Sequence, residues 1–272
     1  MNLSEVKEIT RQYEFLVKKK YGQNFLIDSN IINKIVASAN IGSTDTVLEI
    51  GPGLGSLTKR LSLQCNKVVC VEIDTKLVDI LNDMNIPNVQ VINDDILKTD
   101  IKKVIGSENI KVVANLPYYI STPIITKLLE SEVKTLTIMM QREVADRLRA
   151  LPNTKEYGSL TIFANYNADI SIVTNVSSTC FWPKPNVDST VLHFNVQKNK
   201  LTPKDEKLFY NLVRQAFANR RKTLVNSVAI CGDIKKEIIT KALLHTGLKQ
   251  TIRAEQLTTL DYIKLANVLY FL

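Results

Sequence analysis

The feature that most constrains the fold is an alternation of strand-like and helix-like segments between residues 46 and 150. Apolar runs rich in β-branched residues are followed by segments of helical periodicity, which is typical of a mainly parallel sheet covered by helices on both faces. The pattern predicts strands near 46–51, 67–73, 89–93, 110–115 and 135–141, and helices near 56–63, 75–84, 121–130 and 142–150. Such sheets bind ligands at the carboxyl ends of their strands, so residues there are the first candidates for function.

Two further β-rich runs, at 170–178 and 188–197, are separated by a short connection, which favours an antiparallel pair. The sequence therefore predicts a Rossmann-like α/β fold with a seven-stranded, mostly parallel sheet that includes one antiparallel strand. The polar segment 198–203 ends in proline and is typical of a boundary. Helical periodicity after it predicts a small all-α domain at 201–272, following an α/β domain at 1–200.

The N-terminal region is expected to contribute two helices before the first strand of the alternation. Apolar residues at helical spacing over 3–17 predict the first helix. The second carries an apolar face from Ile31 to Ala39, and Asp28 or Ser29 is expected to cap it while Gly42 ends it.

Positive charge is concentrated in the last third of the chain. The formal net charge is +8, and residues 198–272 hold 14 Lys and Arg against 6 Asp and Glu, so the first 197 residues balance. A basic region beside a neutral one suggests a polyanion such as nucleic acid, although a solvated surface or a helix-end charge cluster would look the same. The candidates for phosphate contact are two basic runs: Lys18, Lys19, Lys20, Arg220, Arg221 and Lys222.

Cysteine and histidine spacing offers no metal or disulfide pattern. The four cysteines lack C-x-x-C spacing and the two histidines are isolated, so we expect reduced thiols, no metal site and a cytoplasmic protein. The N-terminus lacks the pattern of a signal peptide, and no run of about 18 apolar residues suggests a membrane span. We expect no membrane partner.

A glycine-rich turn follows the first strand of the alternation. Residues 46–50 lead into Gly51, Gly53 and Gly55, and glycines at such a turn let a ligand approach the backbone closely. Ser56 stands where a dinucleotide fingerprint requires its third glycine. A dinucleotide site is therefore disfavoured.

Acidic residues end the next two strands. Glu72 is placed to accept hydrogen bonds from two ribose hydroxyls, and Asp95 to accept one from an adenine amino group. Either could instead be an ordinary strand-end charge. Together with the glycine turn they indicate an adenosine ligand without a requirement for phosphates, which S-adenosylmethionine fits best.

The segment Asn115-Leu116-Pro117-Tyr118 follows the strand at 110–115 and is the candidate reaction centre. The Asn115 amide oxygen and the Leu116 carbonyl are suited to accept hydrogen bonds from an exocyclic amine and to aim its lone pair at an electrophile. Tyr118 is suited to stack on the base. A simple junction between a strand and a turn, with a core tyrosine, is the alternative for these four residues taken alone.

Six blocks, in this order along the chain, closely resemble the KsgA-type family of small-subunit rRNA adenine dimethyltransferases. They are residues 21–26, 49–55, 71–74, 115–118, 181–189 and 219–224. The resemblance covers nearly the whole chain and implies a class I methyltransferase domain followed by a helical domain. It also implies methyl transfer from S-adenosylmethionine to the N6 amines of two adjacent adenosines near the 3′ end of small-subunit rRNA, within a ribosomal subunit or its precursor, with a role in ribosome biogenesis. We expect a monomer, because nothing in the sequence demands more.

Matched residue by residue, the resemblance also assigns roles. The cofactor site would comprise Asn24, Leu26, Gly51, Gly53, Glu72, Asp95, Ile96 and Asn115. The catalytic centre would comprise Asn115, Leu116, Pro117, Tyr118 and Phe181. Tyr118 and Phe181 would clamp a flipped base, and stacking of about 1–3 kcal/mol per base offsets much of the cost of extruding it. Packing of Phe181 against Pro183 or Pro185 explains that residue equally well.

Two other functions remain open at this stage. One is the related dimethyltransferase of large-subunit rRNA that confers macrolide resistance, although Gly22, the block at 181–189 and the Arg220–Lys222 run look more like the small-subunit family. The other is an assembly factor that acts mainly by binding an immature subunit. No proline precedes Cys180, which argues against cytosine methylation through a covalent cysteine intermediate.

Overall fold

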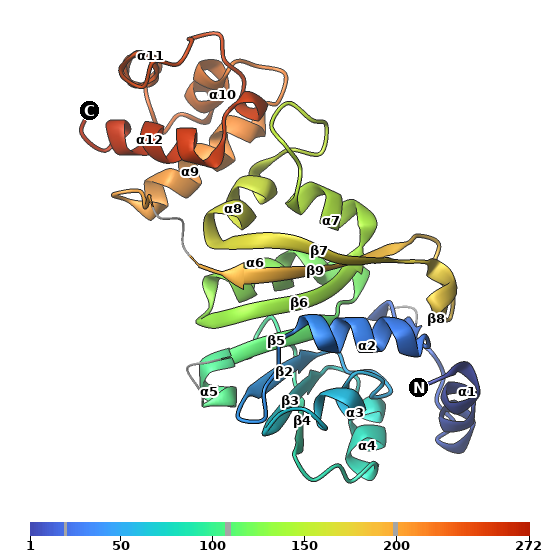
Figure 1. Cartoon of the computed structure of the whole chain (residues 1–272). Helices are drawn as coiled ribbons and strands as arrows, with labels where there is room; N and C mark the ends of the chain where they lie inside the picture. Colours follow the sequence, from blue (N-terminus) through green and yellow to red (C-terminus); the bar gives the residue numbers. More distant parts are fainter. Residues whose placement is uncertain (19–20, 107–109, 198–200) are drawn as a thin grey trace. The chain divides into compact units, whose positions relative to one another are not determined.

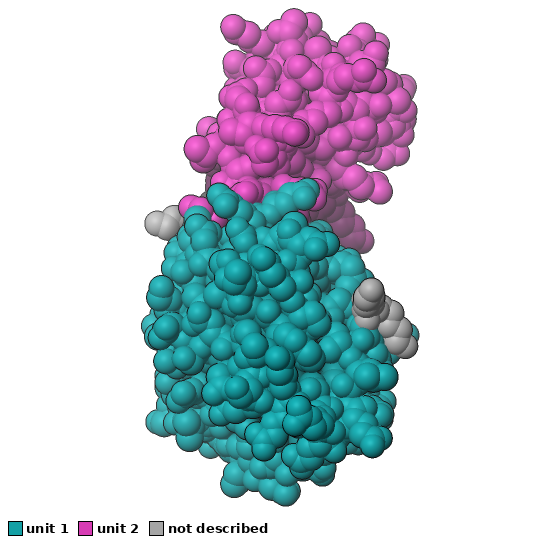
Figure 2. Space-filling view, turned by 90° about the vertical axis from the view of Figure 1, so that its right-hand side faces the viewer, with its two compact units in different colours: residues 1–145, 169–196 teal, residues 146–168, 197–272 magenta. Residues whose placement is uncertain are grey.

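The computed structural model describes residues 1–18, 21–106, 110–197 and 201–272. The chain forms two compact units (Figure 2): residues 1–145 with 169–196, and residues 146–168 with 197–272. The sequence pattern placed a single boundary near residue 200. In the structure the segment 146–168 groups with the C-terminal helices instead.

The first unit is built on a seven-stranded sheet in the order β4-β3-β2-β5-β6-β9-β7 (Figure 1). Its strands are β2 (Thr46–Ile50), β3 (Lys67–Glu72), β4 (Val89–Asn93), β5 (Ile110–Asn115), β6 (Val133–Gln141), β7 (Ala168–Val176) and β9 (Ser189–Val196). Strands β2 to β6 pair in parallel, whereas β9 runs antiparallel to β6 and lies between β6 and β7. The predicted fold class is confirmed.

The helices of this unit follow the predicted alternation with differences at their ends, except that the short helix at Ile101–Ile105 was not predicted. They are α1 (Leu3–Gln12), α2 (Ser29–Ser38), α3 (Thr58–Leu61), α4 (Thr75–Asp83), α5 (Ile101–Ile105) and α6 (Ser121–Glu130), and α7 (Arg142–Leu148) follows β6. Asp28 caps α2 by accepting from the amides of Asn30 and Ile31, as predicted. The end predicted at Gly42 is wrong: α2 stops at Ser38, and Asn40 takes the left-handed conformation with φ +48°.

Helix α1 is also shorter than the apolar stripe suggested. Glu14 adopts a positive φ of +46° just after the helix, which is incompatible with continued α-helix. Val6 on the predicted stripe is buried, but Leu16 is 81% exposed, so the stripe marked an apolar face only in its first part, and the helix ends at Gln12. Phe15, which lies off the stripe, is buried and packs with Val6 and Phe25.

One face of the sheet carries the core that holds the strands in register. Ile32, Ile35 and Val36 of α2 are buried in one cluster with residues of several strands: Val47, Val68, Cys70, Val113 and Met139. This packing fixes the positions at which β2, β3 and β5 end. Those strand ends carry the candidate site.

A second, two-stranded sheet joins distant segments of the same unit. Strand β1 (Phe25–Leu26) pairs antiparallel with β8 (Phe181–Trp182), with Phe25 opposite Trp182 and Leu26 opposite Phe181. The short helical turns η2 (Tyr118–Ile120) and η3 (Ser178–Cys180) precede α6 and β8. The pairing ties the N-terminal segment to the first unit.

The second unit is helical. It contains α8 (Ser159–Asn167), α9 (Glu206–Ala218), α10 (Leu224–Cys231), α11 (Lys236–His245) and α12 (Thr259–Leu269), with the turn η4 (Ala254–Gln256). Its core combines the predicted apolar faces with four buried aromatic residues: Tyr157, Tyr166, Phe209 and Tyr262. Tyr157 and Tyr262 donate to backbone carbonyls, which satisfies their buried hydroxyls.

Candidate active site

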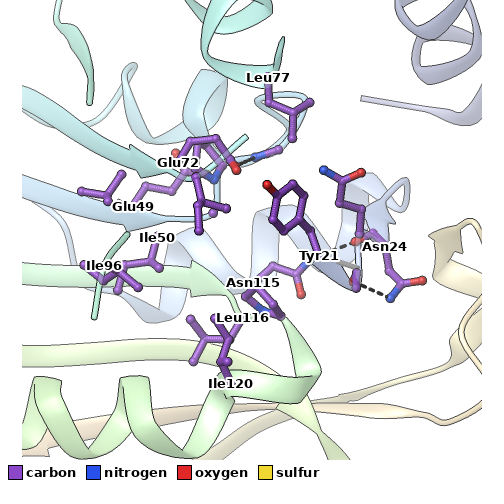
Figure 3. A pocket seen from close by; sticks show the side chains of 18 of the residues that line it. Tyr21, Asn24, Glu49, Ile50, Glu72, Leu77, Ile96, Asn115, Leu116 and Ile120 are labelled. Atoms are coloured by element: carbon purple, nitrogen blue, oxygen red, sulfur yellow. Dashed lines mark hydrogen bonds between the residues drawn. The ribbon is translucent and has the colours of Figure 1, made fainter. Parts of the chain in front are cut away.

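A cavity of about 980 Å³, including its open mouth, lies in the first unit where β2, β3 and β5 end. Its wall contains all eight residues of the expected cofactor site, together with Leu116, Pro117 and Tyr118. Residues 21–26 form another part of the wall (Figure 3). The strand-end pattern thus brings these residues into one cavity.

The glycine turn after β2 needs its glycines for conformation and for space. Gly51 and Gly53 both have positive φ, +63° and +59°. A Cβ on Gly53 would lie 3.1 Å from ring atoms of Phe25, tighter than nine in ten real Cβ contacts, so the ring would have to shift by a few tenths of an ångström. A side chain at Gly53 would therefore strain the turn and shift Phe25 in the cavity wall.

Glu72 at the end of β3 is held by backbone donors. Its two carboxyl oxygens accept from the amide of Asp74 at 3.0 Å and from the amide of Gly53 at 3.3 Å. The side chain is buried, and this burial raises the pKa of Glu72 above its ordinary value. A carboxylate fixed in this way is suited to accept two hydrogen bonds from the vicinal hydroxyls of a ribose.

The end of β4 supplies the next part of the wall. The side chain of Asp95 accepts from the amide of Leu97 at 3.0 Å, and the amide of Asp95 donates to Asp94 at 2.8 Å. Ile96 beside it is buried. These bonds fix the loop in which Asp95 and Ile96 line the cavity, a position suited to contact with an adenine.

Glu49 is a wall residue that the sequence interpretation left without a role. It is only 1% exposed, and burial raises the pKa of its carboxyl to about 7. The Cys70 thiol donates to it at 3.5 Å. Its place within the strand, in the block that precedes the glycines, was the signal available in the sequence.

Asn115 is the last residue of β5, and its amide is oriented by the N-terminal segment. The amide nitrogen donates to the carbonyl oxygen of Asn24 at 3.1 Å, which leaves the amide oxygen as the acceptor. Among the residues that the structure describes, no donor is bonded to the Leu116 carbonyl, while the Pro117 carbonyl accepts from Ile120 and Ser121. Two acceptors therefore stand together at the end of one strand.

The two aromatic residues of the expected clamp are placed differently. Tyr118 lines the cavity, and its hydroxyl is 2.7 Å from the Ser189 hydroxyl, which fixes the ring. Phe181 is 3% exposed, pairs with Leu26 and packs among the core residues around α2. It does not line the cavity, so this conformation favours packing over stacking for Phe181. Its observed neighbours are the core residues around α2, whereas the contact with Pro183 or Pro185 stays a prediction.

The candidate phosphate-binding residues lie in different surroundings. Lys18 forms an ion pair of 2.7 Å with the buried Asp74, while Lys19 and Lys20 lie outside the described residues. Arg220, Arg221 and Lys222 are exposed in the turn after α9 of the second unit. Arg220 donates to the Thr154 carbonyl at 3.0 Å.

Comparisons with known proteins identify the family of the chain. The profile of the family described as ribosomal RNA adenine dimethylase matches residues 14–270. The chain belongs to the ribosomal RNA adenine dimethylase family. The predicted family resemblance is confirmed, and this dimethylase is an enzyme that uses S-adenosylmethionine to methylate adenine in rRNA.

Relatives and solved structures support the assignment over nearly the full length. A ribosomal RNA small subunit methyltransferase A from Alkaliphilus oremlandii is 45% identical over 274 residues, covering 97% of this dimethylase and 95% of that protein. The crystal structure of a dimethyladenosine transferase from Plasmodium falciparum has a TM-score of 0.76 at 28% identity, with 89% and 95% coverage. The 23S rRNA methyltransferase ErmE has a TM-score of 0.70 at 26% identity, with 91% and 100% coverage.

The residues of this dimethylase fit S-adenosylmethionine. The cavity offers a carboxylate for the ribose at Glu72 and an acidic loop for the adenine at Asp95. It also offers side-chain-free backbone at Gly51. When bound, the cofactor supplies an electrophilic methyl group.

No helix among the described residues is long and apolar enough to cross a membrane. Within the same residues, no cluster of three or more His, Cys, Asp or Glu side chains is arranged to hold a metal ion.

Proposed function

We propose that this dimethylase converts two adjacent adenosines near the 3′ end of small-subunit rRNA into N6,N6-dimethyladenosine. The observation that carries the proposal is the pair of acceptors at Asn115 and Leu116 in the wall of the cofactor cavity. The small subunit is favoured because the relative from Alkaliphilus oremlandii, named as a small subunit methyltransferase, aligns with 97% of the chain at 45% identity.

The acceptor pair addresses the chemical difficulty of the substrate. The N6 amine of adenine is a poor nucleophile because its lone pair is delocalised into the ring. Hydrogen bonds from both N–H groups, one to the Asn115 side chain and one to the Leu116 carbonyl, hold the nitrogen where its lone pair is directed at the methyl group. The proton can leave to water after attack, so the site needs no strong base.

The orientation of Asn115 makes this role specific. Its nitrogen is engaged by the Asn24 carbonyl, so the side chain presents an acceptor and selects a substrate with donor hydrogens. An exocyclic amine has such donors, whereas a keto oxygen does not. The site therefore discriminates against bases that present a carbonyl at this position.

The RNA is proposed to reach the enzyme as part of a ribosomal subunit or its precursor in the cytoplasm, with the dimethylase acting as a monomer. The concentration of positive charge in residues 198–272 supports phosphate contacts through the second unit. Arg220, Arg221 and Lys222 are exposed there. They are the residues we assign to these contacts.

Transfer of labelled methyl groups to unmethylated small and large ribosomal subunits, followed by mapping of the label, tests the proposal. We expect label on paired adenosines near the 3′ end of small-subunit rRNA. Label confined to the large subunit would overturn the proposal in favour of the activity named for ErmE, to which the fold is also similar. Absence of label on both would favour an assembly factor that acts by binding.

A further inference from the structure

The N-terminal wall of the cofactor cavity is fastened to one buried carboxylate. Asp74 is 1% exposed although it follows Glu72 by only two residues at the edge of the cavity. Its oxygens accept from the Lys18 ammonium at 2.7 Å and from the Gln23 side-chain amide at 2.9 Å. We propose that Asp74 is a positioning residue that holds residues 21–24 closed over S-adenosylmethionine and couples this closure to Glu72.

Asp74 is connected to Glu72, the carboxylate proposed to hold the ribose. The side chain of Asp74 binds the N-terminal segment, while its backbone amide donates to Glu72 at 3.0 Å. The other oxygen of Glu72 accepts from Gly53 at 3.3 Å. Movement of Asp74 would therefore displace both residues 21–24 and Glu72, the group that would hold the ribose.

Lys18 and Gln23 bind each other as well as Asp74. The backbone amide of Lys18 donates to the side-chain oxygen of Gln23 at 2.8 Å, while the nitrogen of the same side chain donates to Asp74. The Lys18 ammonium also lies 5.8 Å from the centre of the Tyr21 ring, which lines the cavity. A hydrogen bond thereby joins Lys18 to Gln23, and both side chains bind Asp74.

The C-terminal end of the segment, residues 24–26, is held by Asn115 and by β8. The carbonyl of Asn24 accepts from Asn115 at 3.1 Å, and Phe25 and Leu26 pair with β8. Residues 21–26 therefore contact Asp74 through Gln23 and contact Asn115, whose amide would position the target amine, through Asn24. Figure 3 shows Asn24 and Asn115 in the same wall of the cavity. Release of the Asp74 anchor would loosen the cofactor wall before it disturbs the core.

Lys18 is the position at which this inference can be tested without touching the cavity. Its side chain is not part of the cavity wall, so an effect of Lys18 on cofactor affinity must act through the segment. Asp74 is less suitable alone, because it also caps α4 by accepting from the amide of Lys76. Lys18→Met keeps the aliphatic stem and removes only the ammonium.

The experiment measures calorimetric affinity for S-adenosylmethionine and amide hydrogen exchange of residues 21–26, with and without the cofactor. We expect Lys18→Met to weaken binding at least about fivefold, a typical coupling between two sites. We also expect faster exchange of residues 21–26 in the free protein. Lys18→Arg should restore both. Lys102→Met removes an exposed ion pair with Glu132, in which both side chains are 68% exposed, and should change neither.

A double substitution separates coupling from general destabilisation. If Lys18 acts through Asp74, the combination of Lys18→Met with Asp74→Asn should bind the cofactor no more weakly than the weaker of the two single variants. Fully additive losses, or a Lys18→Met protein with unchanged affinity and unchanged exchange, would overturn the inference. The inference rests on S-adenosylmethionine as cofactor and not on which RNA is methylated, so failure of the subunit-labelling test would leave it standing.

Discussion

Glu49 and Glu72 line the same cavity but are held in different ways. Both carboxyl oxygens of Glu72 accept from backbone amides, whereas Glu49 lies at 1% exposure with the Cys70 thiol as a donor. Loss of water around Glu49 raises its pKa to about 7 from an ordinary value of 4.5. The neutral acid is therefore the favoured form of Glu49 in the folded protein below that pH.

Glu49 makes a pH-dependent contribution to stability. A carboxyl with a raised folded-state pKa contributes fully below the unfolded-state pKa and loses this contribution as pH rises through the folded-state pKa. We expect the unfolding free energy of wild type relative to Glu49→Gln to fall by about 3 kcal/mol between pH 4.5 and 7, and to stay level above it. Urea denaturation across this range measures the difference, and a pH-independent difference would contradict this account of Glu49.

Phe181 provides a second test at this scale, because its buried position and its expected stacking role lead to different outcomes. At 3% exposure in the core around α2, Phe181→Ala should lower the unfolding free energy by about 3–5 kcal/mol. Tyr118→Ala, at a half-buried position in the cavity wall, should reduce methyl transfer with a smaller loss of stability. A stable Phe181→Ala protein that fails to methylate RNA would instead assign Phe181 to base stacking.

Sequence reasoning found residues such as Glu72 and Asn115 because their chemistry coincides with strand ends. Sequence reasoning did not decide whether Phe181 lies in the core or in a stacking clamp. The environment of Phe181 depends on pairing with Leu26, more than 150 residues away in the chain. Glu49 was missed for a related reason. Its burial follows from the strands and helices packed around it rather than from its neighbours in sequence.

At the level of elements, the turn between β2 and α3 places a positive-φ glycine against an aromatic residue. Gly53→Ala would introduce a Cβ at 3.1 Å from the Phe25 ring with φ at +59°. We expect at least about a tenfold loss of cofactor affinity, because positive-φ strain alone costs about 1–2 kcal/mol in an L-residue. Gly42→Ala, where the added Cβ meets only Asp45 at 3.6 Å, is the matched control and should bind normally.

Calorimetric titration with S-adenosylmethionine measures this difference. Equal affinities of Gly53→Ala and Gly42→Ala would show that the turn tolerates a side chain. That result would contradict the role given to the glycine turn.

The elements that sequence reasoning anticipated are those with strong local patterns. Strands β2 to β6 were predicted within about two residues of their observed ends because each is rich in apolar and β-branched residues. The two-residue strands β1 and β8 have no such pattern and form only through their mutual pairing. Helix ends were displaced where Glu14 and Asn40 adopt positive φ, which composition does not reveal.

At the level of the whole molecule, the basic character of residues 198–272 is the main link to RNA. The division of the chain is less simple than that charge pattern, because residues 146–168 join the C-terminal helices. Tyr157 and Tyr166 of this segment are buried with Phe209 and Tyr262. Only tertiary packing reveals this grouping, since the segment precedes the last two strands of the sheet in the chain.

The exposed turn after α9 allows a test of RNA binding that leaves the cofactor cavity intact. Arg220→Ala with Arg221→Ala should weaken RNA binding and reduce the slope of log affinity against log salt by about 1–2, as loss of one or two phosphate contacts implies. Cofactor affinity should not change. Lys241→Ala with Lys264→Ala removes the same charge from exposed positions on α11 and α12. An equal slope in both double variants would refute the assignment to Arg220 and Arg221.

The acceptors at Asn115 and Leu116 are proposed to direct methylation to the N6 amine of adenine. Unmethylated small subunits reacted to completion with S-adenosylmethionine can be digested to nucleosides and the methylated products identified by mass spectrometry. We expect N6,N6-dimethyladenosine from the wild type, formed at least about a hundredfold more slowly by Asn115→Ala, because misalignment alone can cost this factor. Methylation at another atom or base, or a wild-type rate in Asn115→Ala, would contradict the account.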